Sequence, residues 1–333
     1  MKVCIVGAGA IGGFIGARLS VAGRAQVCAL ARGASLAALR QHGWRLKQGD
    51  ALLQAPVQAS DSAHDLAGDC GVQDLVLIAV KAPALSAVAE SIAPLLGPRT
   101  LILPAMNGVP WWFADGVAAL GAAPLRSVDP GGAIAAAIPL HQVLGCVVHA
   151  SCATPEPGLV LHKHGQALIV GEIGGGHTER AQRVVDLLAH AGFELTHSKN
   201  VRHDIWYKLW GNMTMNPVSA ITGASIDRVL ADPLVRELCS AAMREAAAIG
   251  ERIGCKIDQS TEDRHAATAR LGAFKSSMLQ DVEAGRPIEL DAIVAAVHEM
   301  GERLGVPTPH IGALFGLTRL FGRVRGIYPE TAR

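Results

Sequence analysis

The sequence predicts an α/β domain built on a parallel sheet, followed by an all-helical domain. Between residue 2 and about residue 103, short apolar β-type runs alternate with helical patterns, as in strands joined by crossover helices. A glycine-rich turn connects the first run to the first helix. No convincing strand follows Asn200, so we expect the boundary near 197–202, with domains at 1–199 and 200–333.

The individual elements follow from hydrophobic periodicity and from Gly and Pro punctuation. The predicted strands are 2–6, 26–31, 74–80, 100–103, 145–151, 158–162, 167–171 and 193–196. The predicted helices are 11–21, 84–96 and 178–191 in the first domain, and 201–223, 234–254, 261–284, 288–305 and 309–324 in the second. Residues 110–144 lose the regular hydrophobic pattern and are rich in Gly, Pro and Ala, so we interpret them as an insertion in the first domain.

Composition narrows the class of protein. The chain has 333 residues, with 30 Lys plus Arg against 29 Asp plus Glu, so its net charge favours neither nucleic acid nor an anionic membrane. Seven cysteines without a Cys-x-x-Cys pair suit reduced thiols and a cytoplasmic location. Glycines and Arg18 interrupt the apolar N-terminal stretch, so no signal peptide is expected. No charge-free run of about 18 residues lacks helix breakers, so a membrane span is not expected either.

The turn after the first strand reads Gly7-Ala8-Gly9-Ala10-Ile11-Gly12. In a strand-turn-helix context, such glycines allow a tight turn, close approach of a pyrophosphate to the backbone, and close packing of helix on strand. The phosphates then lie at the helix N-terminus. The sequence therefore predicts a dinucleotide site at residues 7–12; a purely structural glycine turn is the alternative.

The end of the second strand indicates which dinucleotide is bound. NAD enzymes usually carry an Asp or Glu there for the ribose hydroxyls, but this chain reads Ala29-Leu-Ala-Arg32-Gly33. Arg32 can hold a 2′-phosphate through charge-assisted hydrogen bonds. NADP(H) is therefore the expected cofactor, unless Arg32 is only a solvated surface residue.

A polar row is expected on the helix at 201–223. Lys208, Asn212 and Asn216 are four residues apart, and a step of four advances only about 40° around a helix. An ammonium can stabilise charge on a reacting carbonyl oxygen and donate the proton, and carboxamides can bind a carboxylate. Alternatively, Lys208 is a solvated charge and the asparagines satisfy core backbone groups. Pro217 lacks an N–H and could kink this helix.

Further polar residues stand at the ends of predicted elements. Lys81 and Asn107 follow strands whose carboxyl ends would open onto a ligand crevice. Ser277 and Glu289 lie in the helical half. The alternatives are a surface charge for Lys81, a hydroxyl bonded to its own helix for Ser277, and a first-turn acid for Glu289.

No metal site is expected. His162 and His164 flank Lys163 on a predicted strand, and further ligands are not evident, so an exposed strand is favoured.

Taken together, these residues resemble the ketopantoate reductase (2-dehydropantoate 2-reductase) family nearly from end to end. The resemblance rests on the N-terminal glycine signature, Arg32, the strand-end lysine and Asn107-Gly108. It rests equally on the Lys208/Asn212/Asn216-Pro217 row and on Ser-Ser-Met-Leu-Gln-Asp281 followed by Glu289. It implies a Rossmann domain followed by an all-helical domain of the 6-phosphogluconate dehydrogenase C-terminal type.

The resemblance also implies NADPH-dependent reduction of 2-dehydropantoate to pantoate, a step toward pantothenate. Lys208 would be the general acid, and Glu289 would position the substrate and the hydrogen bonds of the active site. Substrate or nicotinamide would be held by Asn107, Asn212, Asn216 and Ser277, and Lys81 would lie near the cofactor.

Two alternatives remain open at this point: a reductase of another branched or aromatic 2-oxo acid, and a nucleotide-binding regulatory protein without turnover. The segment at 110–144 is longer than in compact members of the family. We expect it to cover part of the site or to form an oligomer contact, and the sequence leaves a homodimer open.

Overall fold

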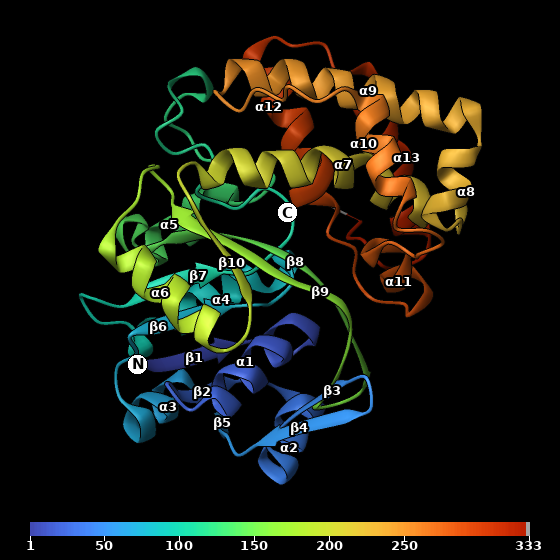
Figure 1. Cartoon of the computed structure of the whole chain (residues 1–333). Helices are drawn as coiled ribbons and strands as arrows, with labels where there is room; N and C mark the ends of the chain where they lie inside the picture. The colour runs from blue at the N-terminus through green and yellow to red at the C-terminus, as the bar shows by residue number, and fades with distance from the viewer. Residues whose placement is uncertain (331–333) are drawn as a thin grey trace. The chain divides into compact units, whose positions relative to one another are not determined.

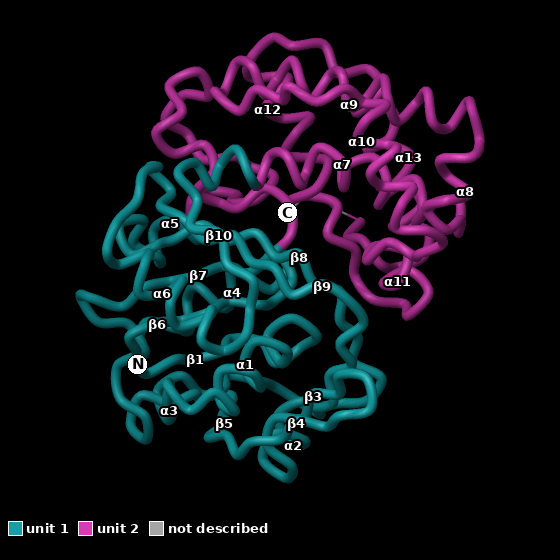
Figure 2. The backbone as a smooth tube through the Cα atoms, in the orientation of Figure 1, with its two compact units in different colours: residues 1–106, 133–204 teal, residues 107–132, 205–333 magenta. Residues whose placement is uncertain are grey.

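A computed structural model describes residues 1–330 of the chain (Figure 1). The chain forms two compact units (Figure 2). Unit 1 contains Met1–Met106 and Ala133–Asp204, and unit 2 contains Asn107–Gly132 together with the described residues from Ile205 onward. The division after Asp204 lies close to the boundary expected at 197–202. Segment 107–132 belongs to unit 2, although the sequence placed it in the first domain.

Unit 1 is built on a five-stranded parallel sheet with the strand order β5-β2-β1-β6-β7, which confirms the predicted α/β class. The strands of this sheet are β1 (Lys2–Val6), β2 (Gln26–Leu30), β5 (Gln58–Ser60), β6 (Leu75–Ile78) and β7 (Leu101–Pro104). Their apolar side chains are buried because crossover helices cover a parallel sheet on both faces.

A second sheet in unit 1 was not foreseen as a separate layer. Its strand order is β10-β9-β3-β4, and β8 pairs with β9. The strands are β3 (Trp44–Gln48), β4 (Ala51–Ala55), β8 (Leu144–Glu156), β9 (Leu159–Glu172) and β10 (Glu194–Ser198). The predicted strands 158–162 and 167–171 are thus one continuous strand.

Helix α1 (Ala10–Ala22) packs against this second sheet as well as the first, so nearly all of its sides are covered. A Cβ built on Gly13 would lie 2.6 Å from Val160 of β9, and one on Gly16 would lie 2.7 Å from the Trp44 ring of β3. The glycines of α1 therefore serve helix packing as well as the preceding turn.

Residues 32–73, to which the sequence analysis assigned no element, contain α2, β3, β4, β5 and α3. The helices of unit 1 are α2 (Gly33–His42), α3 (Ala63–Cys70), α4 (Leu85–Ser91), α5 (Ala133–Ala137) and α6 (Glu179–His190), with short 3₁₀ turns around α4 and after α5. β3 and β4 form a hairpin whose two-residue turn is Gly49-Asp50, a recognised hairpin signal.

Unit 2 is helical, as predicted, and no β-strand occurs among its described residues. Its helices are α7 (Val201–Thr222, with its first turn in unit 1), α8 (Ile226–Ala231), α9 (Pro233–Arg252), α10 (Thr261–Ala269), α11 (Ser277–Glu283), the π-helical turn η6 (Asp291–Ala295), α12 (Ala296–Leu304) and α13 (Pro309–Val324). The predicted helix 261–284 is two helices, because the Ser276 side chain caps a new one by accepting from the Leu279 N–H. The predicted helix 288–305 begins as the π-turn.

Within the described part of the chain, no helix is long and apolar enough to cross a membrane. None of the seven cysteines, all of which are described, forms a disulfide, and six of them are buried.

Candidate active site

The glycine turn of unit 1 has the backbone that its sequence requires. Gly7 has φ +93°, a conformation that favours glycine, and a Cβ on Gly12 would lie 1.9 Å from the Gly7 carbonyl oxygen. Gly9 is exposed, and apart from its two chain neighbours no heavy atom of the described residues lies within 4 Å of an added Cβ. The turn is therefore tightly packed at Gly7 and Gly12, whereas space remains open beside the backbone at Gly9.

Helix α1 begins directly after this opening, at Ala10. Gly9 is its N-cap, and among the described residues no side chain caps this end of the helix. Its first N–H groups thus have no side-chain acceptor, and the helix dipole there favours an anion. Ala8 and Ile11 complete the turn, Ala8 buried and Ile11 half-buried. The residues present fit the pyrophosphate of a dinucleotide.

The two other predicted cofactor residues also lie in unit 1. Arg32 is exposed at the end of β2 and is the N-cap residue of α2. A guanidinium beside a helix N-terminus suits a phosphate group. Lys81 is half-buried and follows β6, directly before a short 3₁₀ turn at Ala82–Ala84.

The polar row lies on α7 in unit 2, as the spacing predicted. The Lys208 ammonium donates to the Asn107 carboxamide oxygen over 2.8 Å. Asn107 is uncharged, so it orients the ammonium without forming an ion pair. Asn212 is half-buried, whereas Asn216 is only 6% exposed and its Nδ2 has no partner among the described residues. A buried amide without a partner costs about 1–3 kcal/mol.

Aromatic side chains hold α7 in place. The Trp210 indole N–H donates to the Met243 carbonyl of α9 over 2.7 Å. Trp206 stacks on Phe113, with ring centroids 5.9 Å apart. Trp111 and Trp112 are at most 3% exposed, as is Phe113, so these rings pack inside the chain and present little surface to a partner.

Asn107 is positioned by the two residues that follow it. Gly108 has φ +85°, and a Cβ there would lie 2.6 Å from the Ala292 carbonyl oxygen. The Val109 N–H donates to that same oxygen over 2.7 Å. Only glycine allows this close approach. The hydrogen bond therefore fixes the start of segment 107–132 on the π-turn η6 and keeps Asn107 within reach of Lys208.

The remaining predicted residues also lie in unit 2. Glu289 is half-buried and stands two residues before η6. Ser277 is exposed at the first position of α11, directly after its cap Ser276. The structure thus joins Asn107 to Lys208 directly, and it brings the Glu289 segment close to Asn107 through Ala292.

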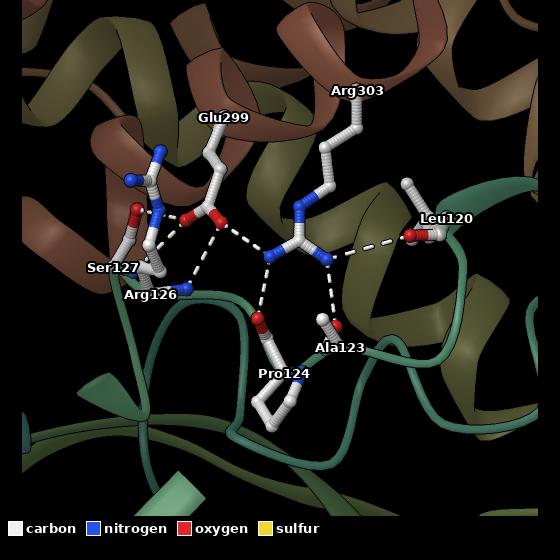
Figure 3. Close-up of polar contacts among 7 residues, drawn as sticks. All are labelled: Leu120, Ala123, Pro124, Arg126, Ser127, Glu299 and Arg303. Atoms are coloured by element: carbon white, nitrogen blue, oxygen red, sulfur yellow. Dashed lines mark hydrogen bonds and ion pairs between the residues drawn. The ribbon is translucent and has the colours of Figure 1, made fainter. Parts of the chain in front are cut away.

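A second set of hydrogen bonds, which was not predicted from the sequence, holds segment 107–132 on α12 (Figure 3). Glu299 of α12 accepts from the N–H groups of Arg126 and Ser127, both over 2.9 Å, and from the Ser127 hydroxyl over 2.6 Å. Arg303, one turn later, donates to Glu299 and to the carbonyls of Leu120, Ala123 and Pro124. The i,i+4 Glu-Arg pair was visible in the sequence, but its loop partners were not.

The charge state of Glu299 follows from these contacts. Burial alone would raise the pKa of this carboxyl group, but hydrogen bonds from Ser127, Arg126 and Arg303 outweigh burial and lower it. Glu299 is therefore a structural carboxylate whose charge stabilises the segment that begins with Asn107.

The described residues contain no group of three or more metal-ligating side chains. His162 stacks on Phe14 at a centroid distance of 4.7 Å, and its ring nitrogens face Gln48 and the Gly165 carbonyl. This histidine has a packing role within unit 1.

The fold and these side chains define a Rossmann-type oxidoreductase with a helical second domain. The family model described as "Ketopantoate reductase PanE/ApbA" matches residues 3–175, and its C-terminal counterpart matches 200–321. The chain is 41% identical over 329 residues to a 2-dehydropantoate 2-reductase of Mesorhizobium japonicum, covering 98% of this chain and 100% of that protein.

Solved structures agree. A Ralstonia solanacearum MolK2 protein, crystallised as a candidate ketopantoate reductase, is 53% identical, with a TM-score of 0.93 over 98% of this chain and 99% of that one. A PanE/ApbA family ketopantoate reductase from Ralstonia eutropha JMP134 is 28% identical, with a TM-score of 0.81 over 98% of this chain and 100% of that one. The chain belongs to the ketopantoate reductase family, as the sequence motifs indicated.

Proposed function

We propose that this chain reduces 2-dehydropantoate to pantoate with NADPH and that Lys208 donates the proton. The carrying observation is the 2.8 Å hydrogen bond from Lys208 to Asn107, at the head of the Asn212 and Asn216 row. The 41% identity to a protein named 2-dehydropantoate 2-reductase, over 98% of the chain, supports this substrate.

The chemistry needs a cation beside the carbonyl group that is reduced. When bound, the reduced nicotinamide supplies the hydride to the carbonyl carbon. Lys208 stabilises the negative charge that develops on the carbonyl oxygen and transfers a proton to it. Asn107 keeps the ammonium oriented, and the buried aromatic anchors of α7 limit its motion.

Uncharged side chains that donate hydrogen bonds bind the substrate. Asn212 and Asn216 hold the 2-oxo acid, and the buried, unpartnered Nδ2 of Asn216 supports this role. Carboxamides can donate to a substrate carboxylate without neutralising Lys208. Ser277 supplies a further hydroxyl, and Glu289 positions the substrate and the hydrogen bonds around it.

The cofactor is held mainly by residues of unit 1. Residues 7–12 bind the pyrophosphate, and Arg32 with the α2 N-terminus binds the 2′-phosphate that distinguishes NADP(H) from NAD(H). Lys81 lies near the cofactor, and Asn107 and Glu289 help to hold the nicotinamide. The enzyme would then act in the cytoplasm on the route to pantothenate, and seven cysteines without a disulfide support that location.

The test is a steady-state assay that follows NADPH absorbance with a panel of 2-oxo acids. The panel contains 2-dehydropantoate, shorter and longer branched 2-oxo acids, and an aromatic one. We expect the highest kcat/KM with 2-dehydropantoate. A higher kcat/KM with another 2-oxo acid would mean that this acid, and not 2-dehydropantoate, is the substrate. The proposed hydride and proton transfer would be unchanged. Tight NADPH binding without oxidation by any acid would favour the regulatory alternative. Light scattering of the same preparation tests for a homodimer.

A further inference from the structure

The helix that follows Glu289 begins with an unusual turn. Residues Asp291–Ala295 are π-helical and continue directly into α12. A π-turn is wider and rarer than an α-turn, and such turns occur frequently at functional sites. Its position fixes where the chain before it, including Glu289, enters the helix.

Contacts from the C-terminal segment hold both sides of Glu289. On one side, the Ile288 N–H donates to the Ile327 carbonyl over 3.1 Å. On the other side, the Tyr328 hydroxyl donates to the Asp291 carboxylate. All of these residues belong to unit 2. Neither Tyr328 nor Asp291 has a part in the chemistry proposed above.

The segment that carries Tyr328 is itself fixed on α13. The Ile327 N–H donates to the Gly322 carbonyl over 2.9 Å, and the Arg323 side chain donates to the Pro329 carbonyl over 3.0 Å. A Cβ on Gly322 would lie 2.7 Å from the Cβ of Tyr328, so the absence of a side chain at Gly322 allows this approach. The Tyr328 hydroxyl is therefore presented from a fixed backbone.

We propose that Tyr328, through Asp291, is a positioning residue for the reaction: it holds the π-turn and thereby sets Glu289 and Asn107. The link to Asn107 runs through Ala292, whose carbonyl accepts from the Val109 N–H over 2.7 Å. The Tyr328 hydroxyl thus influences the positions of both Glu289 and Asn107. This inference rests on the proposed function.

The local chemistry supports a fixed hydrogen bond. Burial and the Asp291 carboxylate raise the pKa of Tyr328, so the phenol stays protonated and remains a donor at neutral pH. Loss of the hydroxyl would leave Asp291 without this donor and free the π-turn to shift. A displacement of about 1 Å at a reacting group can lower turnover by up to about 10²-fold.

The experiment compares Tyr328→Phe, Asp291→Asn and the double variant with the wild type. We expect each single variant to lower kcat about tenfold, which is less than the loss of about 10²-fold for a displacement of about 1 Å. KM for the 2-oxo acid should rise several-fold. NADPH affinity should stay within twofold. The double variant should be no worse than either single one, because both remove the same bond. A smaller folded fraction would lower turnover without raising KM, so a purely structural role predicts a different pattern.

The matched control is Ser240→Ala, which removes another buried hydroxyl of unit 2, bonded to His265 over 2.9 Å. It should leave both KM values within twofold. A wild-type chain without turnover overturns the proposed function and this inference together. A wild type with turnover, beside Tyr328→Phe and Asp291→Asn variants with unchanged KM and kcat, overturns this inference alone.

Discussion

Replacing Glu299 by Gln should destabilise unit 2, although Glu299 itself takes no part in the proposed chemistry. The wild-type carboxylate accepts four hydrogen bonds, two at each oxygen, from Arg126, Ser127 and Arg303. A carboxamide has one acceptor oxygen, so two of the donors drawn around Glu299 in Figure 3 would face an N–H₂ group in the variant. The Ser127 hydroxyl can rotate to accept, but a backbone N–H cannot.

The magnitude follows from this geometry. One stranded backbone N–H costs about 1–3 kcal/mol, and weakening the charge-assisted bond to Arg303 adds roughly 1 kcal/mol. The expected loss is about 3 kcal/mol in the free energy of unfolding, at the lower end of the roughly 3–5 kcal/mol for breaking a buried ion pair. With a urea m-value of about 2 kcal/mol per M, the midpoint should fall by about 1.5 M.

Tryptophan fluorescence is a suitable probe because four of the five tryptophans, at 111, 112, 206 and 210, lie in unit 2. The control is Glu302→Gln on the same helix. Its side chain is 61% exposed, and the change should stay within about 0.5 kcal/mol.

The difference between wild type and Glu299→Gln should also depend on pH. The folded-state pKa of Glu299 is lowered, so its contribution is present above the unfolded value of about 4.3 and is lost as pH falls through the folded value. The gap should be full at pH 7 and narrow below about pH 4.3. A gap under about 1 kcal/mol at pH 7, or one that is equal at pH 7 and in strong acid, would refute the reasoning.

Three further predictions concern the proposed site. Lys208→Ala should lower kcat by about 10²-fold or more, with NADPH affinity nearly intact, because it removes a general acid; surviving turnover in the assay would remove that role. Arg32→Asp should raise the Kd for NADPH far more than that for NADH, and equal weakening in a binding titration would mean that Arg32 does not contact the 2′-phosphate. Gly108→Ala should destabilise unit 2 by about 1–3 kcal/mol in urea unfolding and lower turnover, because its φ is +85° and its Cβ would meet the Ala292 carbonyl. An unchanged midpoint would argue against the fastening at Ala292.

Local sequence signals predicted much of the architecture. The Gly7-Ala-Gly9 turn, the buried strands of the parallel sheet and the long helices at 201–223, 234–254 and 309–324 were readable because period and punctuation are local properties. The second sheet was harder to foresee. Its strands β3 and β4 are short and partly polar, and β9 crosses a glycine at 165 that looks like a break.

The candidate site was predicted residue by residue, but its supports were not. Spacing placed Lys208, Asn212 and Asn216 on one helical face, and the structure adds the Asn107 acceptor for Lys208. Glu299 was not predicted, because its loop partners are 172 and 173 residues away in the chain. Tyr328 showed no sequence signal at all.

The sequence by itself determined the fold class, the family and the row of polar side chains on α7, because each depends on short-range patterns and ordered motifs. Only the tertiary structure decided which unit contains segment 107–132 and what holds Asn107, Glu289 and the π-turn. Those decisions come from hydrogen bonds between residues far apart in the chain. No local propensity encodes such pairings; packing of the folded helices brings the partners together.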